Sequence, residues 1–572
     1  MTDIDFGRFS KYKNHKRSNT WRPNPIVQST KTKFPSRITK KNDRIDNNNV
    51  ISKLKTLSIW KNHNCISCKD CKKCHTCNND LSCNSNSSYN IPKLSNEAGE
   101  YNETSEYNEY NEISEYNETN EISSIDIDWK LQIYNNKFVY GINPAINKND
   151  TENNSYFLAQ YTGPSINLGD ITLTTNNSAI FFAQINSSGT ITSAFNLWSY
   201  NGVREDYQFG QLKFTNENEL IIISTFVGQI TFSNGTIISD TNGNVFIAKL
   251  LANGTPIWIR QITAKSINDI YFDLDTEDNI YICGTFSGTL QINDPNSTTI
   301  TSNLESNMFV GKLSQNGITQ WLKTATGTGY NTGEGVSYSP SDETIVIIGT
   351  FNGQFIINGD ILVNENNICN MWVAKLNLDG EVLNLVAPLN PTPEDPSDEY
   401  MDGGQIMVDS TGDVFIVGDM FGNFIFGDIE IDVSRKSVFV TKLNENLEWD
   451  WVQIQQVDIP DNNSFQLKLT IINSYIYVAN YGIGTVRYIQ INGDDESSGY
   501  VKFECEGSGS LDHIISKLNK TGKWLASTKI CGTVENFSID IVSNNTNVYV
   551  TGTHCVNTER TDAYLVNIDQ SF

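Results

Sequence analysis

Long apolar runs are missing from this chain of 572 residues. No stretch approaches the ~20 consecutive apolar residues that a membrane-spanning helix needs, so we expect no membrane span. The N-terminal stretch "MTDIDFGRFSKYK" also lacks the apolar segment of a secretory signal peptide. The sequence therefore predicts a protein located in the cytoplasm of the cell that makes it.

Histidine and the common catalytic motifs are scarce as well. The chain has five histidines, and only His513 and His554 lie beyond residue 124. No G-x-S-x-G elbow, His-Glu-x-x-His motif or Walker loop is present. The sequence points to no reaction, and we assign no catalytic and no cofactor-binding residue.

Charge is distributed unevenly along the chain. Residues 1–75 carry 18 Lys/Arg against five Asp/Glu, whereas the rest of the chain carries 23 against 61. Residues 1–60 combine the basic charge with few apolar side chains, a composition typical of a disordered arm. Such an arm could contact nucleic acid through phosphate charge, without sequence specificity. The alternative is a solvated tail, or one that binds an acidic protein surface.

The next segment, residues 61–84, is dense in cysteine: six of the eleven cysteines fall within nineteen residues. The candidate metal ligands are Cys65, Cys68, Cys71, Cys74, Cys77 and Cys83, with His63 or His75 as spare ligands. Thiolates and imidazoles can hold a tetrahedral Zn²⁺, although the longer loop that usually separates two Cys-x-x-Cys pairs is missing. Disulfide cross-linking is the main rival. An iron–sulfur cluster is a third interpretation, but its closing Cys-Pro is absent.

Residues 85–124 are expected to form a linker. From Glu100 to Ser123 the chain repeats Tyr, Asn and Glu and contains no basic residue. Glutamates at every third position repel one another, which favours an extended, solvated chain.

From residue 125 onward, short runs of Val, Ile, Phe and Tyr alternate with clusters of Gly, Asn, Asp and Ser, which predicts β-strands. Two landmarks each recur seven times, as in "NIYICGTFSG" at Asn279 and "FVGKL" at Phe309. Each copy spans roughly 65 residues and offers about four strands, the size of a propeller blade with its loops. In the third copy we expect strands at 269–274, 279–286, 308–313 and 319–325.

A third landmark is a Trp that follows a Gly turn. It is present as Trp258, Trp321 and Trp524, with Trp449 or Trp451 in the fifth copy. The last copy stops before this strand, whereas "IDIDWKLQI" at 125–133 precedes the first copy. We therefore expect the N-terminal strand to complete the last repeat, with Trp129 as its Trp. The predicted fold class is all-β: a seven-bladed β-propeller over residues 125–572, closed by an N-terminal strand and preceded by a disordered arm.

The repeat also resembles a known family. The pattern D-x-x-G-N-x-Y-x-x-G-T, then D-x-F-V-x-K-L and G-x-x-x-W, is carried by "DLDTEDNIYICGTF", "VDSTGDVFIVGDM" and the Phe-Val-x-Lys-Leu series. It resembles the seven-bladed β-propeller repeat of bacterial surface proteins, which implies the fold and says little about activity. The Asn-rich style, the linker and the cysteine-rich arm together resemble uncharacterised proteins of Mimivirus-like giant viruses. That second resemblance implies a place in a virion.

Polar residues within the repeats are expected to be structural. His554 occupies the place that Phe226, Phe286 and Phe351 hold in other copies, which indicates packing. Asp275 and Asp409 precede turns that they should cap, with a Ca²⁺ site at 273–279 as the alternative. A repeated contact with a carboxylate or carbonyl is expected for Lys249, Lys312, Lys375, Lys442 and Lys517.

These features favour a non-enzymatic structural or protein-interaction propeller, tethered by its basic, cysteine-rich arm. Acidic insertions at 390–404 and 492–510 favour a basic protein partner. One alternative is a glycan-binding or catalytic propeller that uses its channel face. Another is a zinc-dependent nucleic-acid binder that acts through residues 1–85. The oligomeric state is not predicted.

Overall fold

The computed structural model describes residues 123–568, apart from residue 136 and residues 202–209, 365–367, 392–398, 459–465, 493–494, 503–510, 531–534 and 558–559. The described residues are all-β, as expected. They include no helix of the length and apolarity that a bilayer crossing requires. The predicted arm and cysteine-rich segment, and all but the last two residues of the linker, lie outside the described residues.

Seven repeats follow one another, and in each of them four strands pair antiparallel in a row. The first repeat contains β3 (Val139–Ala145), β4 (Ser155–Thr162), β7 (Ser178–Ile185) and β8 (Ile191–Tyr200). The second contains β9 (Gly210–Phe214), β10 (Leu220–Phe232), β11 (Ile237–Leu250) and β12 (Pro256–Thr263). The third contains β13 (Ser266–Leu274), β14 (Ile280–Ile292), β15 (Thr299–Leu313) and β16 (Thr319–Thr324). The fourth repeat contains β18 (Gly335–Ser339), β19 (Thr344–Phe351), β22 (Asn370–Asn377) and β23 (Val382–Val386). The fifth contains β24 (Tyr400–Val408), β25 (Val414–Phe426), β26 (Ile429–Leu443) and β27 (Trp449–Asp458). The sixth contains β28 (Lys468–Ile472), β29 (Tyr475–Asn492), β31 (Asp512–Asn519) and β32 (Trp524–Ile530).

The seventh repeat takes its fourth strand from the other end of the described chain. Its own strands are β33 (Glu535–Ser543), β34 (Val548–Asn557) and β35 (Arg560–Ile568). Next to β35 lies β2 (Ile127–Ile133), antiparallel to it and with Leu131 opposite Leu565. This is the pairing expected for the N-terminal strand. Just before β2, the short strand β1 (Ser123–Ser124) runs parallel to β32 of the sixth repeat.

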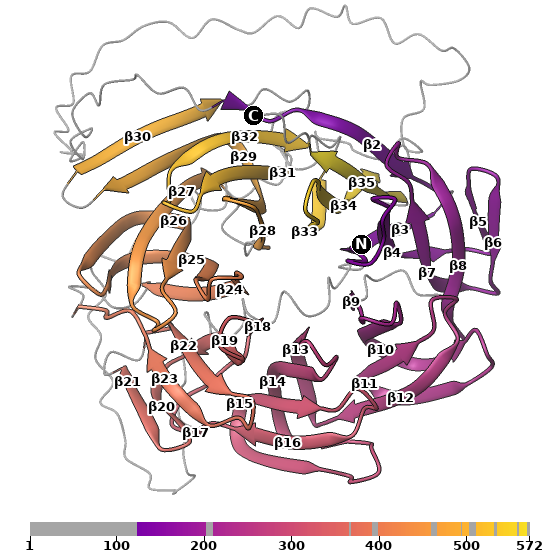
Figure 1. Ribbon diagram of the computed structural model, residues 1–572, viewed down its shortest axis with the longest axis horizontal. Helices are drawn as coiled ribbons and strands as arrows, with labels where there is room; N and C mark the ends of the chain where they lie inside the picture. Colours follow the sequence, from indigo (N-terminus) through magenta and orange to yellow (C-terminus); the bar gives the residue numbers. More distant parts are fainter. Residues whose placement is uncertain are drawn as a thin grey trace, which may run out of the picture. The chain divides into compact units, whose positions relative to one another are not determined.

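The innermost strands form a closed series of contacts. Each of β3, β9, β13, β18, β24, β28 and β33 contacts the innermost strand of the next repeat, and β33 contacts β3. Figure 1 shows these seven strands facing a common centre.

Side chains join neighbouring innermost strands at all seven junctions. At six of them a side-chain oxygen accepts a backbone N–H of the next repeat, and at the seventh the Asn143 amide donates to Asp540 Oδ2 at 2.6 Å. The six acceptor and donor pairs are Asn143 with Leu212, Gln211 with Phe272, Asp273 with Tyr338, Ser337 with Val408, Gln405 with Leu469, and Gln466 with Ile539. We call this set the junction circuit. Because Asn143 takes part in two of its bonds, it links the last repeat to the first and the first to the second.

Apolar side chains fill the space between successive repeats. Ile221 and Ile223 of β10 pack against the third repeat, whereas their neighbours Leu220 and Ile222 belong to the core shared with the first. Both faces of the strand are therefore buried, which explains its continuous apolar run. The glycine of the first landmark makes room for this packing: a Cβ on Gly284 would collide with the Asp269 carbonyl and the Phe309 ring.

The Trp landmark joins four of the outermost strands to the next repeat. Trp258 donates its indole N–H to the Gln315 carbonyl at 3.2 Å, and its ring covers Gly317. Trp129, Trp321 and Trp451 make the same contact with the Ser187, Leu378 and Lys520 carbonyls. In the fourth repeat Asn384 replaces the indole and donates to the Asn446 carbonyl. Trp129 is thus equivalent to the other Trp residues, as expected.

One landmark residue was wrongly aligned from the sequence. Trp451 lies opposite Lys442, as Trp258 lies opposite Lys249, whereas Trp524 lies opposite Leu518. Trp524 is therefore equivalent to Trp449, and it packs on Tyr488 instead of reaching the next repeat. The bulge beside Lys517 recurs beside Lys249 and Lys442, so it does not cause the difference. Trp524 follows Gly522 by two residues, whereas Trp258 follows Gly254 by four, and this difference in spacing was overlooked in the alignment.

Several hairpins extend further than the sequence suggested. The outer end of β10 pairs with β8 of the preceding repeat, with Phe232 opposite Trp198, and β14 and β29 pair with β12 and β27 in the same way. The fourth repeat uses separate short strands, β17 (Thr326–Gly327), β20 (Gly353–Ile357) and β21 (Asp360–Asn364). The first repeat carries the small hairpin of β5 (Ser165–Leu168) and β6 (Ile171–Thr174), and β30 (Asp495–Lys502) pairs with β29.

The junction circuit predicts that replacing Asn143 lowers the free energy of unfolding more than replacing Ser337. Asn143→Leu removes one bond at the closing junction and one between the first and second repeats, and it leaves the Asp540 carboxylate and the Leu212 N–H without these partners. Unsatisfied buried groups cost about 1–3 kcal/mol each, so we expect the free energy of unfolding in urea to fall by about 3 kcal/mol. Ser337→Ala, which removes one bond elsewhere, should cost about 1 kcal/mol. A loss for Asn143→Leu no larger than that of Ser337→Ala would contradict the closing role of Asn143.

Candidate functional site

The metal site predicted for Cys65, Cys68, Cys71, Cys74, Cys77, Cys83 and His75 lies outside the described residues. Within the described part of the chain, no three His, Cys, Asp or Glu side chains are grouped so that they could hold a metal ion. The described cysteines Cys283, Cys369 and Cys555 form no disulfide with one another. Burial raises the pKa of the Cys283 thiol to about 12, so it remains a protonated core residue.

The repeated lysines make the structural contacts expected of them. Lys312 and Lys442 lie 3.9 Å from Asp275 and 3.1 Å from Asp413, and Lys249 pairs with Glu219. Lys375 pairs with Asp342 and donates to the carbonyl of Glu445 in the next repeat. The ammonium of Lys517 lies 4.2 Å from the ring centre of Tyr475. These lysines hold the first hairpin of their repeats and form no ring of free charge.

The loop at 273–279 is a capped turn in this structure. Asp275 Oδ1 accepts the backbone N–H groups of Glu277 and Asn279, and its Oδ2 accepts the Asn279 amide. Asp273 pairs with Lys213 at 2.6 Å, and Asp278 accepts the N–H of Asn216. The carboxylates therefore face hydrogen-bond donors, as predicted for a turn cap. Asp409 caps its turn in the same way through Thr411 and Asp413.

Both histidines of the repeats belong to one buried cluster at the closing repeat. His513 of β31 contacts the Tyr564 hydroxyl of β35, and the ring of His554 on β34 stacks on Tyr564 with centroids 4.6 Å apart. Lys130 of β2 lies 3.0 Å from His554 Nε2. The cluster thus joins four strands, and one of them is the N-terminal strand. His554 packs within its repeat, as expected.

Burial determines the charge state of this cluster. It lowers the pKa of His513 well below the ordinary histidine value, and the neighbouring His554 and Lys130 lower it further. His554 has a pKa of about 3 for the same reason, with Lys130 contributing repulsion. Burial and Asp512 raise the pKa of Tyr564. His513 and Tyr564 have no exposed surface, so a substrate has no access to them and the cluster is a packing element.

The polar groups at the centre of the repeats are engaged with one another. The carboxylate of Asp273 binds both Lys213 and the Tyr338 N–H, and Asp540 binds Asn143 and the Ile541 N–H. Gln211, Gln405 and Gln466 each accept a backbone N–H of the next repeat. The junction circuit therefore uses, for structure, the side chains that a channel-face active site would need.

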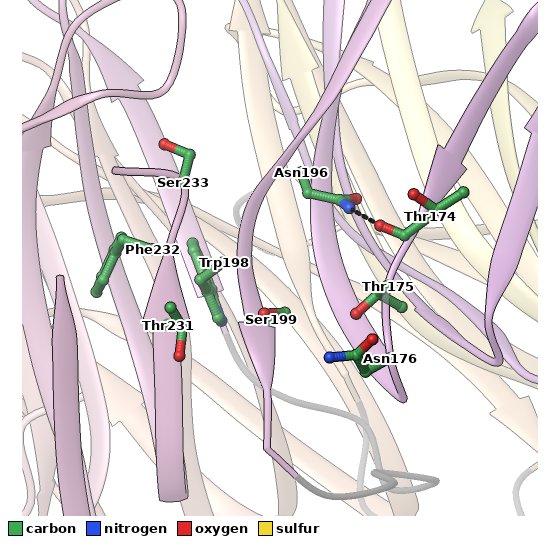
Figure 2. Close-up of a pocket in the computed structure, with 9 residues that line it drawn as sticks. All are labelled: Thr174, Thr175, Asn176, Asn196, Trp198, Ser199, Thr231, Phe232 and Ser233. Carbon is green, nitrogen blue, oxygen red and sulfur yellow. Dashed lines mark hydrogen bonds between the residues drawn. The ribbon is translucent and has the colours of Figure 1, made fainter. Parts of the chain in front are cut away.

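A cavity of about 310 Å³ lies away from this centre, between the first and second repeats. Its walls come from the end of β6 and the turn after it, from β8, and from the end of β10 (Figure 2). Three threonines, two asparagines and two serines line it, together with Trp198 and Phe232. Sequence reasoning missed this pocket. The β5–β6 hairpin that forms one wall has a counterpart in β20–β21 of the fourth repeat, so no departure from the repeat pattern marked the pocket in the sequence.

No protein-family model and no curated protein match the sequence. Solved structures with β-propeller-like folds do align with it. The polysaccharide lyase Uly1 is 10% identical, with 78% of this chain and 100% of that chain covered and a TM-score of 0.40. The endosialidase of phage phi92 is 9% identical, with 78% of this chain and 70% of that chain covered and a TM-score of 0.34. Virginiamycin B lyase from Staphylococcus aureus is 8% identical, with 76% of this chain and 98% of that chain covered and a TM-score of 0.31. Alignments this distant carry no argument about activity, so function is argued from the residues of this chain.

The neutral histidines predict acid sensitivity. Between the ordinary histidine pKa of ~6.5 and the pKa of about 3 of His554, the unfolded chain binds more protons than the folded one. The free energy of unfolding therefore falls as pH drops through this window, by about 1.4 kcal/mol per pH unit for each buried histidine. His554→Phe, which places the residue of other repeats here, should make the fall between pH 6.5 and 5 shallower by about 2 kcal/mol.

His554→Gln is the matched control, because glutamine keeps an acceptor for Lys130 and does not titrate. In both variants the urea midpoint should fall less between pH 6.5 and pH 5 than it does in the wild-type protein. If the midpoint falls as much in both variants as in the wild type, His554 is not buried in its neutral form.

Proposed function

We propose that residues 125–572 form a seven-bladed β-propeller and that this propeller is a non-enzymatic interaction scaffold. The pairing of β2 with β35 and the closed series of innermost strands support the closed ring. One observation carries the functional proposal: the junction circuit engages the polar side chains of the innermost strands, so that they hold the ring together. A rigid ring of this kind presents its outer loops for binding.

The partner that fits this scaffold is a basic protein surface. Residues 125–572 carry 22 Lys/Arg against 51 Asp/Glu. Many of the basic groups are already engaged within the fold, as Lys529 is with Asp512 and Arg560 with Asp562. The uncompensated charge is therefore negative, which attracts cationic partners and repels nucleic acid. The insertion at 390–404 adds five Asp/Glu and no basic residue.

The N-terminal region is proposed to be a tether that precedes the propeller. In this proposal residues 1–60 are a basic arm, residues 61–84 hold a soft metal such as zinc, and residues 85–124 link them to the ring. A location in the cytoplasm or in a virion stays a prediction from the sequence.

The scaffold proposal predicts selective binding of polycations. The full chain should bind a fluorescent polylysine peptide, with affinity falling as salt rises, and should bind polyglutamate at least tenfold more weakly. Neutralising Glu394, Asp395 and Asp398 to their amides should weaken polylysine binding several-fold. The matched control removes the same charge at exposed Asp170, Glu217 and Glu343 and should have less effect. No polylysine binding, or equal losses in the two variants, would overturn the assignment of this partner surface.

The tether proposal predicts zinc that depends on the cysteines. Full chain purified under reducing conditions should contain about one zinc per molecule, and replacing the six clustered cysteines by serine should remove it. A zinc-free chain that migrates as a reductant-sensitive ladder on a gel would instead establish disulfide cross-linking.

A further inference from the structure

The pocket between the first and second repeats is held by regular structure on three sides. β8 and β10 pair there, with Ser199 opposite Thr231. The third wall is tied to β8 because the Asn196 amide donates to the Thr174 carbonyl at 2.8 Å (Figure 2). Walls fixed by backbone pairing lose little entropy when a ligand binds.

The chemistry of the lining is neutral and rich in hydrogen-bonding groups. None of its nine residues is charged, and seven carry a hydroxyl or a carboxamide. Trp198 and Phe232 are only 1% and 2% exposed, so they support the pocket from beneath and leave most of its accessible surface to the seven polar residues. Among the described residues, no hydrogen bond engages the side chains of Thr174, Asn176 or Ser199, so donors and acceptors remain available at the rim.

These groups select among classes of ligand. An ionic ligand gains most from an opposite charge, which the lining lacks, and a purely apolar ligand would cover hydroxyl groups without satisfying them. A hydroxyl-rich ligand matches the lining, because hydroxyls and carboxamides both donate and accept hydrogen bonds. The volume of about 310 Å³ is at the lower end of the range for small-molecule pockets, which favours a single ring over an extended chain.

We propose that this pocket binds one residue of a neutral carbohydrate. The site lies at the outer edge of the repeats, away from the channel face, and it does not depend on the scaffold function or on its basic partner. The hydroxyls of Thr174 and Ser199 and the amide of Asn176 bind the sugar hydroxyls.

The test is saturation-transfer NMR of the full chain with the methyl glycosides of glucose, galactose, mannose and N-acetylglucosamine, with glucuronate as the charged comparison. At least one neutral glycoside should receive saturation and glucuronate should not. Ser199→Trp, which fills the pocket, should lower the affinity at least tenfold. Asn176→Ala should lower it about fivefold, the loss expected for one neutral hydrogen bond.

The matched control is Thr301→Trp, which places the same bulk on an exposed strand of the third repeat. It should leave sugar binding unchanged, and Asn176→Ala keeps the test valid if Ser199→Trp fails to fold. The proposal is overturned if no neutral glycoside binds, if glucuronate binds equally well, or if binding survives in Ser199→Trp. Polylysine binding is measured separately, so either proposal can fail without the other.

Discussion

The structure depends on one repeated interaction, the hydrogen bond between innermost strands of successive repeats. At six junctions a side-chain oxygen accepts a backbone N–H, and at the seventh Asn143 reaches back to Asp540. Backbone groups near the centre have no room for a further strand, so a side chain must supply the partner that a buried N–H requires. The residue types differ between junctions, and so does their position along the strand, but every bond joins the innermost segments of two successive repeats. This explains how seven divergent repeats remain in one arrangement.

Much of the fold could be predicted because its causes are local. The run "NIYICGTF" encodes a strand buried on both faces, and Gly284 marks the site where the Phe309 ring crosses it. Because the last repeat lacks its fourth strand, we expected the N-terminal strand to supply it, with Trp129 as the landmark Trp. The Trp129 indole does donate to the Ser187 carbonyl. The register of Trp524 could have been predicted, because Trp524 follows its turn glycine by two residues whereas Trp258 and Trp321 follow theirs by four. The strand bulge that follows Lys517 also follows Lys249 and Lys312, so it leaves this offset unchanged.

The candidate site was less predictable than the fold. Sequence reasoning correctly treated Lys249 and Asp275 as structural because they recur in several repeats, and His554 because it takes the place of a recurring Phe. It gave no indication of the pocket, whose walls come from three segments that only the hairpin extension of β10 brings together. Recurring polar residues therefore maintain contacts within and between repeats, whereas the pocket depends on the pairing of β8 with β10, which spacing along the sequence does not record.

The central claim is that the N-terminal strand closes the ring by pairing with β35. Hydrogen exchange of the β35 amides in chains that begin at residue 123 or at residue 135 tests it most directly. The account predicts slow exchange across β35 in the longer chain and fast exchange in the shorter one. The amides of β14, which lie far from the closing repeat in the sequence, should serve as the internal reference. Equal protection of β35 in the two chains would contradict closure by β2.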